Sequence, residues 1–122
     1  MELAPDAAHG GKVSRKSIAE AEVGLGLEDA AAVKGLRRDP SQAAEFIDDS
    51  GQAWDVKGFH SQVPPGAKGA FTLEDAMKSI KRELALGENV MVDTRNMTAK
   101  HVDELREAVR AAGEERRVLF WP

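Results

Sequence analysis

The chain has 122 residues, of which 42% are hydrophobic and 31% charged, and it carries a formal net charge of -4. This length suits one domain with one hydrophobic core, and the composition is that of a folded protein. The sequence contains no cysteine, which excludes disulfide bonds and thiolate metal sites. The acidic balance excludes a polycation that coats nucleic acid without specificity, although it permits a local basic groove.

The start of the sequence differs from the rest. Residues 1–13 contain Pro5 and two adjacent glycines but few large apolar side chains, so we expect a flexible, linker-like lead. They lack a basic segment followed by an apolar one and do not predict a signal peptide. No apolar run approaches the roughly 20 residues that a transmembrane helix needs. Residues 14–122 are expected to form the folded domain.

A helix and a β-hairpin are predicted in the first half of this domain. From Ser14 the apolar residues recur at helical spacing, and Gly35 is the expected end of the helix. Pro40 disfavours any continuation of the helix. Two short strands follow at 44–48 and 53–59, and the Asp-Ser-Gly sequence between them is typical of a three-residue hairpin loop.

The second half alternates between helices and strands, and each helix begins at a threonine and ends at a glycine that can cap it. The predicted elements are a helix over 72–87, a strand over 89–92, a helix over 98–113 and a strand over 118–121. This alternation favours an α/β fold in which the later strands are parallel and joined by right-handed crossovers. We therefore expect a single compact α/β domain, with an N-terminal helix, a β-hairpin and a mixed sheet flanked by helices.

Charged side chains gather on one face of the predicted hairpin. Asp55 and Lys57 are two residues apart on a strand and point to one face, whereas Trp54 and Val56 point to the other, into the core. If the hairpin is symmetric about its turn, Glu45 lies opposite Asp55 and shares that face. Two carboxylates can hold a divalent cation, and a lysine beside them can act on an attacking water or on phosphate charge.

The segment from Glu45 to Lys57, EFIDDSGQAWDVK, resembles the acidic-residue, hairpin and (D/E)-x-K signature of the PD-(D/E)XK nucleases. It is most similar to the compact nuclease domains at the C-termini of bacterial polymorphic toxins, including effectors of contact-dependent growth inhibition. The resemblance covers residues 14–93 and implies a restriction-endonuclease-like fold.

The resemblance also implies a metal-binding glutamate on the first helix. That helix carries Glu20, Glu22 and Glu28. Glu20 is the first choice, because Val23 and Leu27 follow it at helical spacing and align it with the buried stripe. Glu22 and Glu28 are the alternatives.

One position departs from the family pattern. Glu45 stands where the family usually has aspartate, and its longer side chain changes where the carboxylate can lie. Asp48 is the alternative ligand, but alternation along the strand should turn it away from the face of Glu45.

The resemblance implies a metal-dependent endonuclease that hydrolyses phosphodiester bonds in DNA or RNA, with tRNA among the RNA substrates. Glu45, Asp55 and Glu20 would hold Mg²⁺, or else Mn²⁺ or Zn²⁺, and Lys57 would position the attacking water or stabilise the developing charge. It further implies an antibacterial toxin domain of a larger secreted or cell-surface protein. Such a domain is delivered into the cytoplasm of a target bacterium and is neutralised by a cognate immunity protein.

Three more residues are candidates for binding substrate. His60 follows the hairpin, Lys68 lies in a proline-rich loop and Arg38 precedes the hairpin, and each can contact phosphate. The same residues are compatible with plain surface charges, and Asp55 and Lys57 with an ordinary exposed ion pair. The alternative function is then a non-catalytic α/β binding module whose acidic cluster binds a protein partner.

Overall fold

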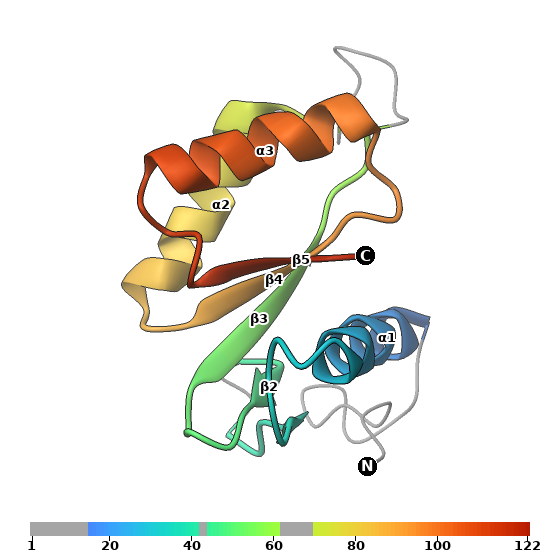
Figure 1. Ribbon diagram of the computed structural model, residues 1–122, viewed down its shortest axis with the longest axis vertical. Helices are drawn as coiled ribbons and strands as arrows, with labels where there is room; N and C mark the ends of the chain where they lie inside the picture. Colours follow the sequence, from blue (N-terminus) through green and yellow to red (C-terminus); the bar gives the residue numbers. More distant parts are fainter. Residues whose placement is uncertain (1–14, 42–43, 62–69) are drawn as a thin grey trace.

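The computed structural model describes residues 15–41, 44–61 and 70–122. These residues form a small α/β domain of three helices and one five-stranded sheet, as the sequence predicts (Figure 1). In chain order the elements are α1 (Arg15–Asp29), β1 (Arg37–Arg38), β2 (Phe46–Ile47), β3 (Ala53–Gly58), α2 (Leu73–Ala85), β4 (Asn89–Asp93), α3 (Ala99–Ala111) and β5 (Val118–Trp121). In this part of the chain no helix is both long and apolar enough to cross a membrane.

The sheet is mixed, and its strands lie side by side in the order of the sequence. β2 is antiparallel to both β1 and β3, with Phe46 opposite Trp54 in the hairpin. β3, β4 and β5 are parallel, because α2 and α3 connect them as crossovers. The hairpin and the parallel strands were both predicted from the sequence, whereas the short edge strand β1 was not.

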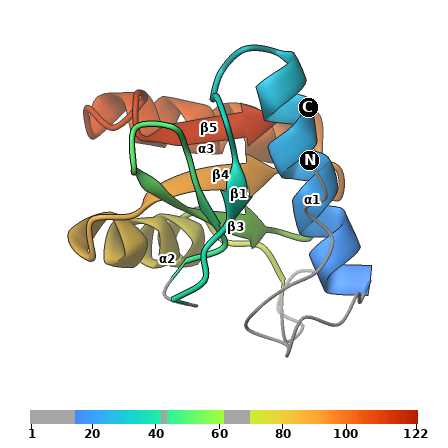
Figure 2. The ribbon, with the colours of Figure 1, turned by 90° about the horizontal axis from the view of Figure 1, so that it is seen from below.

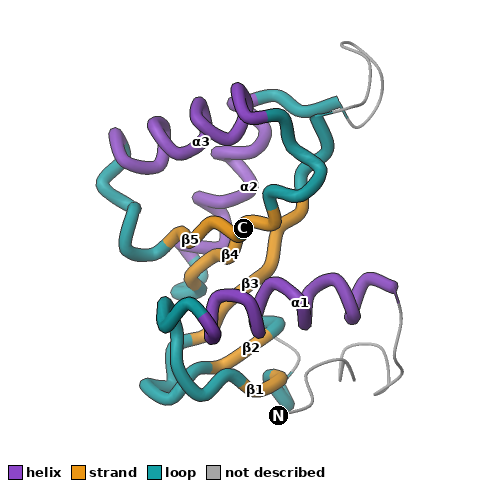
Figure 3. Tube along the Cα trace, turned by 45° about the vertical axis from the view of Figure 1, so that its right-hand side comes forward, coloured by secondary structure: helices purple, strands orange, loops and turns teal. Residues whose placement is uncertain are grey.

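Helices cover both faces of the sheet. α2 and α3 pack on one face and α1 on the other, which the tube view also shows (Figure 3). Alternate side chains of each strand therefore enter different cores. Met91 packs with the α1 side, whereas Val90 and Val92 pack under α2 and α3.

α1 lies near the carboxyl ends of the three parallel strands, as the view from below shows (Figure 2). A glycine allows this close approach. A Cβ atom at Gly26 would lie 2.1 Å from Nε1 of Trp121 in β5, so a larger residue would force the helix away from the strand. Gly26 therefore allows the first helix to pack directly against the last strand.

The prediction for the end of the first helix was wrong. α1 ends at Asp29, and Ala31 has a positive φ of 59° that turns the chain out of the helix. The Glu28 side chain supports this turn, because its Oε2 accepts a hydrogen bond of 2.9 Å from the backbone N–H of Leu36. Val33 fits the helical spacing, but it lies in the loop after α1 and is buried there.

Candidate functional site

Asp55 and Lys57 lie on β3 and face α2, on the face opposite Trp54, as alternation along the strand predicts. The Lys57 ammonium is 3.1 Å from Oδ2 of Asp55 and 3.3 Å from Oε1 of Glu83 in α2. Burial alone would lower the pKa of Lys57. The charges and hydrogen bonds of Asp55 and Glu83 outweigh that effect and hold the pKa above its ordinary value. The lysine is therefore a fixed positive charge between two carboxylates.

A third carboxylate lies within electrostatic reach of this ion pair. Glu88, which immediately precedes β4, is only 8% exposed, and its Oε1 is buried without a hydrogen-bond partner among the described residues. Burial raises the pKa of Glu88, and the negative charges of Glu83 and Asp55 raise it further. We call Asp55, Lys57, Glu83 and Glu88 the Lys57 cluster. It holds three carboxylates and one cation.

A second set of ion pairs lies on the α1 side. Nη1 of Arg38 is 3.2 Å from Oε1 of Glu20 and 3.3 Å from Oε2 of Glu45. Nη2 of Arg38 donates a hydrogen bond of 2.9 Å to the backbone carbonyl of Ser17 in α1. The guanidinium also lies over the ring of Phe46, 4.7 Å from its centroid. We call Glu20, Arg38 and Glu45 the Arg38 cluster.

The structure thus brings Glu20 together with Glu45 and Asp55 together with Lys57. The further partners of these pairs come from opposite faces of the sheet, α1 for the first and α2 for the second. A single cation shared by Glu45 and Asp55 stays a prediction. In the segments that the structure describes, no three histidine, aspartate or glutamate side chains are grouped so as to hold a metal ion.

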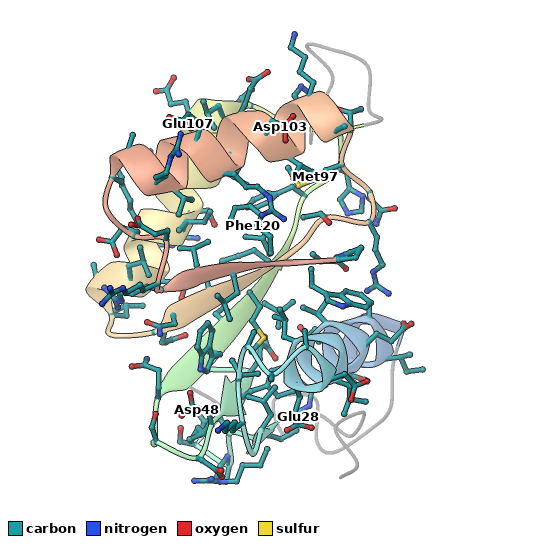
Figure 4. The ribbon with its side chains drawn as sticks, in the orientation of Figure 1. Glu28, Asp48, Met97, Asp103, Glu107 and Phe120 are labelled. Atoms are coloured by element: carbon teal, nitrogen blue, oxygen red, sulfur yellow. The ribbon has the colours of Figure 1, made fainter. Side chains whose placement is uncertain are left out.

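The alternative acidic residues have other contacts. Glu22 is exposed and lies 3.3 Å from Nη1 of Arg95, and Glu28 supports the turn after α1. Oδ2 of Asp48 accepts a hydrogen bond of 2.9 Å from Nε1 of Trp54, and Oδ1 accepts one from the backbone of the hairpin turn. Figure 4 shows Asp48 in the hairpin and Glu28 near the end of α1.

Hydrogen bonds explain the charge state of Asp48. Burial alone would raise its pKa, but the hydrogen bonds that Ser50, Trp54 and Gln52 donate hold it below the ordinary value. Asp48 thus stabilises the turn. Of the residues predicted to bind substrate, Arg38 is in the Arg38 cluster, His60 is exposed after β3, and Lys68 lies outside the described residues.

A cleft of about 320 Å³ lies at the carboxyl ends of β3 and β4. We call it the Glu20 cleft; its walls are Ala19, Glu20, Val56, Gly58, His60, Asp93 and Asn96. In α/β proteins the carboxyl ends of parallel strands are where ligands bind. Glu20 is 4% exposed, and its Oε2 is buried without a partner among the described residues.

Asp93 in this cleft is neutralised by Arg95. Oδ1 of Asp93 accepts hydrogen bonds from the backbone N–H and Nε of Arg95, and Oδ2 lies 2.8 Å from Nη2. Burial alone would raise the pKa of Asp93. The hydrogen bonds and charge of Arg95, with a smaller effect of His60, hold it below the ordinary value. Asp93 is therefore ionised and fully paired.

Sequence reasoning missed Glu83 and Glu88. One signal for Glu83 was available, because it follows buried Ile80 by three residues and lies at the margin of the apolar stripe of α2. For Glu88 the sequence shows only a charged residue before a strand. Its burial depends on how α2 and β3 pack against it.

Comparisons with protein-family models, with curated proteins and with solved structures gave no match for this chain. The resemblance of residues 45–57 to the PD-(D/E)XK nucleases therefore stays a prediction.

Proposed function

We propose that this chain is a metal-dependent endonuclease whose centre is the Lys57 cluster. The observation that carries the proposal is the position of Lys57, within 3.3 Å of two carboxylates from different elements and close to a third that is buried. Such a lysine can donate hydrogen bonds to an attacking water or to a non-bridging phosphate oxygen. In a partly buried site these interactions are stronger than in water.

Mg²⁺ and Mn²⁺ prefer carboxylate oxygens, and the Lys57 cluster carries three carboxylates. Among the described residues these side chains are not grouped closely enough to hold an ion as they stand, so binding would have to draw them together. The buried Oε1 of Glu88 supports metal binding, because a carboxylate oxygen without a partner is costly unless a cation or a donor reaches it. Asp55 would be a ligand together with Glu88 or Glu83 of the same cluster, and Glu45, which immediately precedes β2, is the further predicted ligand. A bound metal ion would lower the pKa of a coordinated water and neutralise phosphate charge.

The fold supports the same function. The chain has the N-terminal helix, β-hairpin and mixed sheet that the resemblance implies, and Asp55 and Lys57 lie on its third strand. That strand is antiparallel to β2 and parallel to β4, so residues from the hairpin and from α2 can both reach its charged face.

Cleavage of plasmid DNA and of total tRNA with and without Mg²⁺ or Mn²⁺ tests the proposal. We expect metal-dependent cleavage of one of them, and its loss in Asp55→Ala with the melting temperature of the metal-free protein nearly unchanged. Asp103→Ala is the matched control, because this exposed aspartate of α3 lies outside both clusters (Figure 4). Cleavage that survives in Asp55→Ala contradicts the proposal. Absence of cleavage together with no metal effect on melting favours a non-catalytic binding module.

The biological role is a second part of the proposal and rests on the resemblance alone. We infer an antibacterial toxin domain that acts in the cytoplasm of a target bacterium and is neutralised by an immunity protein. Expression inside a bacterium should arrest growth for the wild type and not for Asp55→Ala. Equal growth of both strains, at equal protein levels, contradicts this role.

A further inference from the structure

The Glu20 cleft contains a buried acceptor that has no donor. Oε1 of Glu20 is bound to Arg38, whereas Oε2 is buried and unpartnered among the described residues. A buried carboxylate oxygen without a donor costs stability. Because Glu20 forms part of the cleft wall, a ligand with N–H groups in the cleft could supply that donor.

The charge of the cleft selects against phosphate. Glu20 and Asp93 are wall residues, and their partners Arg38 and Arg95 are shared with Glu45 and Glu22. Two arginines thus face four carboxylates, and the surroundings of the cleft are negative. A phosphate would be repelled, whereas an uncharged group with hydrogen-bond donors would be attracted.

The other polar residues of the cleft wall further restrict the class of ligand that can bind. The Asn96 amide and the His60 ring can each donate a hydrogen bond, and both line the cleft with Glu20. A guanine base matches this set, because N1–H and the exocyclic amino group are adjacent donors and O6 and N7 are acceptors. The apolar walls formed by Ala19 and Val56 suit the faces of the ring.

We propose that the Glu20 cleft binds an unpaired guanine base of the nucleic-acid substrate. This inference rests on the proposed function and adds a recognition site to it. The cleft lies on the α1 face of the sheet and the Lys57 cluster on the α2 face, and Gly58 and His60 of the cleft follow Lys57 directly in the chain. A strand of nucleic acid that passes around the carboxyl end of β3 can place a base in the cleft and a phosphodiester at Lys57.

Binding is measured without cleavage, by fluorescence anisotropy in EDTA with labelled RNA nonamers. One nonamer is all uridine, one has a central guanosine, and one has a central inosine, which lacks the exocyclic amino group. We expect the guanosine nonamer to bind roughly tenfold more tightly than the all-uridine one, and inosine to lose most of that preference. Equal affinity for all three overturns the inference.

Glu20→Gln should abolish the preference for guanosine. Its matched control is Glu22→Gln, which removes a carboxylate of the same helix from Nη1 of Arg95 but does not line the cleft. The control should keep the preference. Loss of the preference in both variants, or its survival in Glu20→Gln, contradicts the assignment to Glu20.

Gly58→Leu is a second variant that leaves both ion clusters intact. A Cβ atom at Gly58 would meet no heavy atom within 4 Å, so the leucine can fill the cleft without backbone strain. We expect this variant to bind the guanosine nonamer no more tightly than the wild type binds the inosine nonamer. Metal-dependent cleavage of all three nonamers at equal rates would overturn the recognition site while the proposed function stands. If none is bound or cleaved, the inference is overturned together with its premise.

Discussion

The Arg38 cluster and the Lys57 cluster each place one cation between two carboxylates, yet they are built differently. Arg38 binds Glu20 and Glu45, donates to a backbone carbonyl of α1, and lies over the ring of Phe46. Its planar guanidinium serves several partners in fixed directions. Arg38 thereby fastens α1 to β1 and β2.

The Lys57 cluster has a compact ammonium in place of the guanidinium and one carboxylate more. Lys57 pairs with Asp55 and Glu83, and burial together with the negative charges of Glu83 and Asp55 raises the pKa of Glu88. Both carboxylates of the Arg38 cluster pair with its cation, whereas Glu88 forms no ion pair with Lys57, and a buried charge without a partner is poorly suited to stabilise a fold. The comparison indicates that the Arg38 cluster holds the domain together and that the Lys57 cluster is available for chemistry.

The largest expected effect is on cleavage by Lys57→Met. The rate should fall roughly 1,000-fold, about 4 kcal/mol of activation free energy, because the donor to the reacting groups is lost. Metal binding, followed as the rise in melting temperature with Mn²⁺, should persist or increase once the positive charge is gone. Lys57→Arg serves as the charge-preserving control. Unchanged cleavage in Lys57→Met would remove the distinction between the two clusters.

Arg38→Met should have the largest effect on folding. It leaves the buried Glu20 carboxylate without its cation, and the free energy of unfolding should fall by about 3 kcal/mol. Urea denaturation of this variant and of Lys57→Met gives the comparison directly. We expect the free energy of unfolding to fall by less than about 1 kcal/mol for Lys57→Met, because the ion pairs of this lysine are partly exposed to solvent. Equal losses would show that both clusters stabilise the fold.

Glu88→Gln should stabilise the metal-free protein at neutral pH, by about 1 kcal/mol. The raised pKa means that the folded state binds the Glu88 proton more tightly than the unfolded state. The cost of the ionised carboxylate is therefore full above the folded pKa and vanishes as the pH falls toward 4.5, the ordinary value. Melting curves of both proteins across this range should converge at low pH. A constant difference at every pH contradicts the expected charge effect.

The smallest effect is expected for Asp93→Asn. The pair with Arg95 should contribute about 0.5 kcal/mol at neutral pH, because ion pairs at a partly exposed site contribute little. The lowered pKa of Asp93 means that this contribution is present above 3.8, the ordinary value, and is lost as the pH falls below it. Thermal unfolding of wild type and variant should therefore differ at pH 7 and agree at low pH. An undiminished difference in acid would assign the effect to packing.

Much of the fold could be predicted from local patterns. Thr72 and Thr98 cap their helices as expected, each accepting a hydrogen bond from the backbone N–H three residues later. The alternation along β3 correctly predicted that Asp55 and Lys57 share one face. These features depend on spacing within one element, which the sequence displays directly.

The sites were harder to predict, because they depend on contacts between distant segments. Arg38 reaches Glu20 across 18 positions, and Lys57 reaches Glu83 across 26. Neither spacing follows from a helical or strand period. The burial of Glu88 arises only when α2 and the sheet have packed.

The contact between Gly26 and Trp121 also constrains the order in which the chain folds. α1 is among the first elements to be synthesised, but the strand against which Gly26 packs is the last. Until Trp121 is present, the apolar face of α1 lacks part of its cover, and contacts of such long sequence separation form slowly. α1, which supplies Ala19 and Glu20 to the cleft, is therefore fully covered only once β5 has formed.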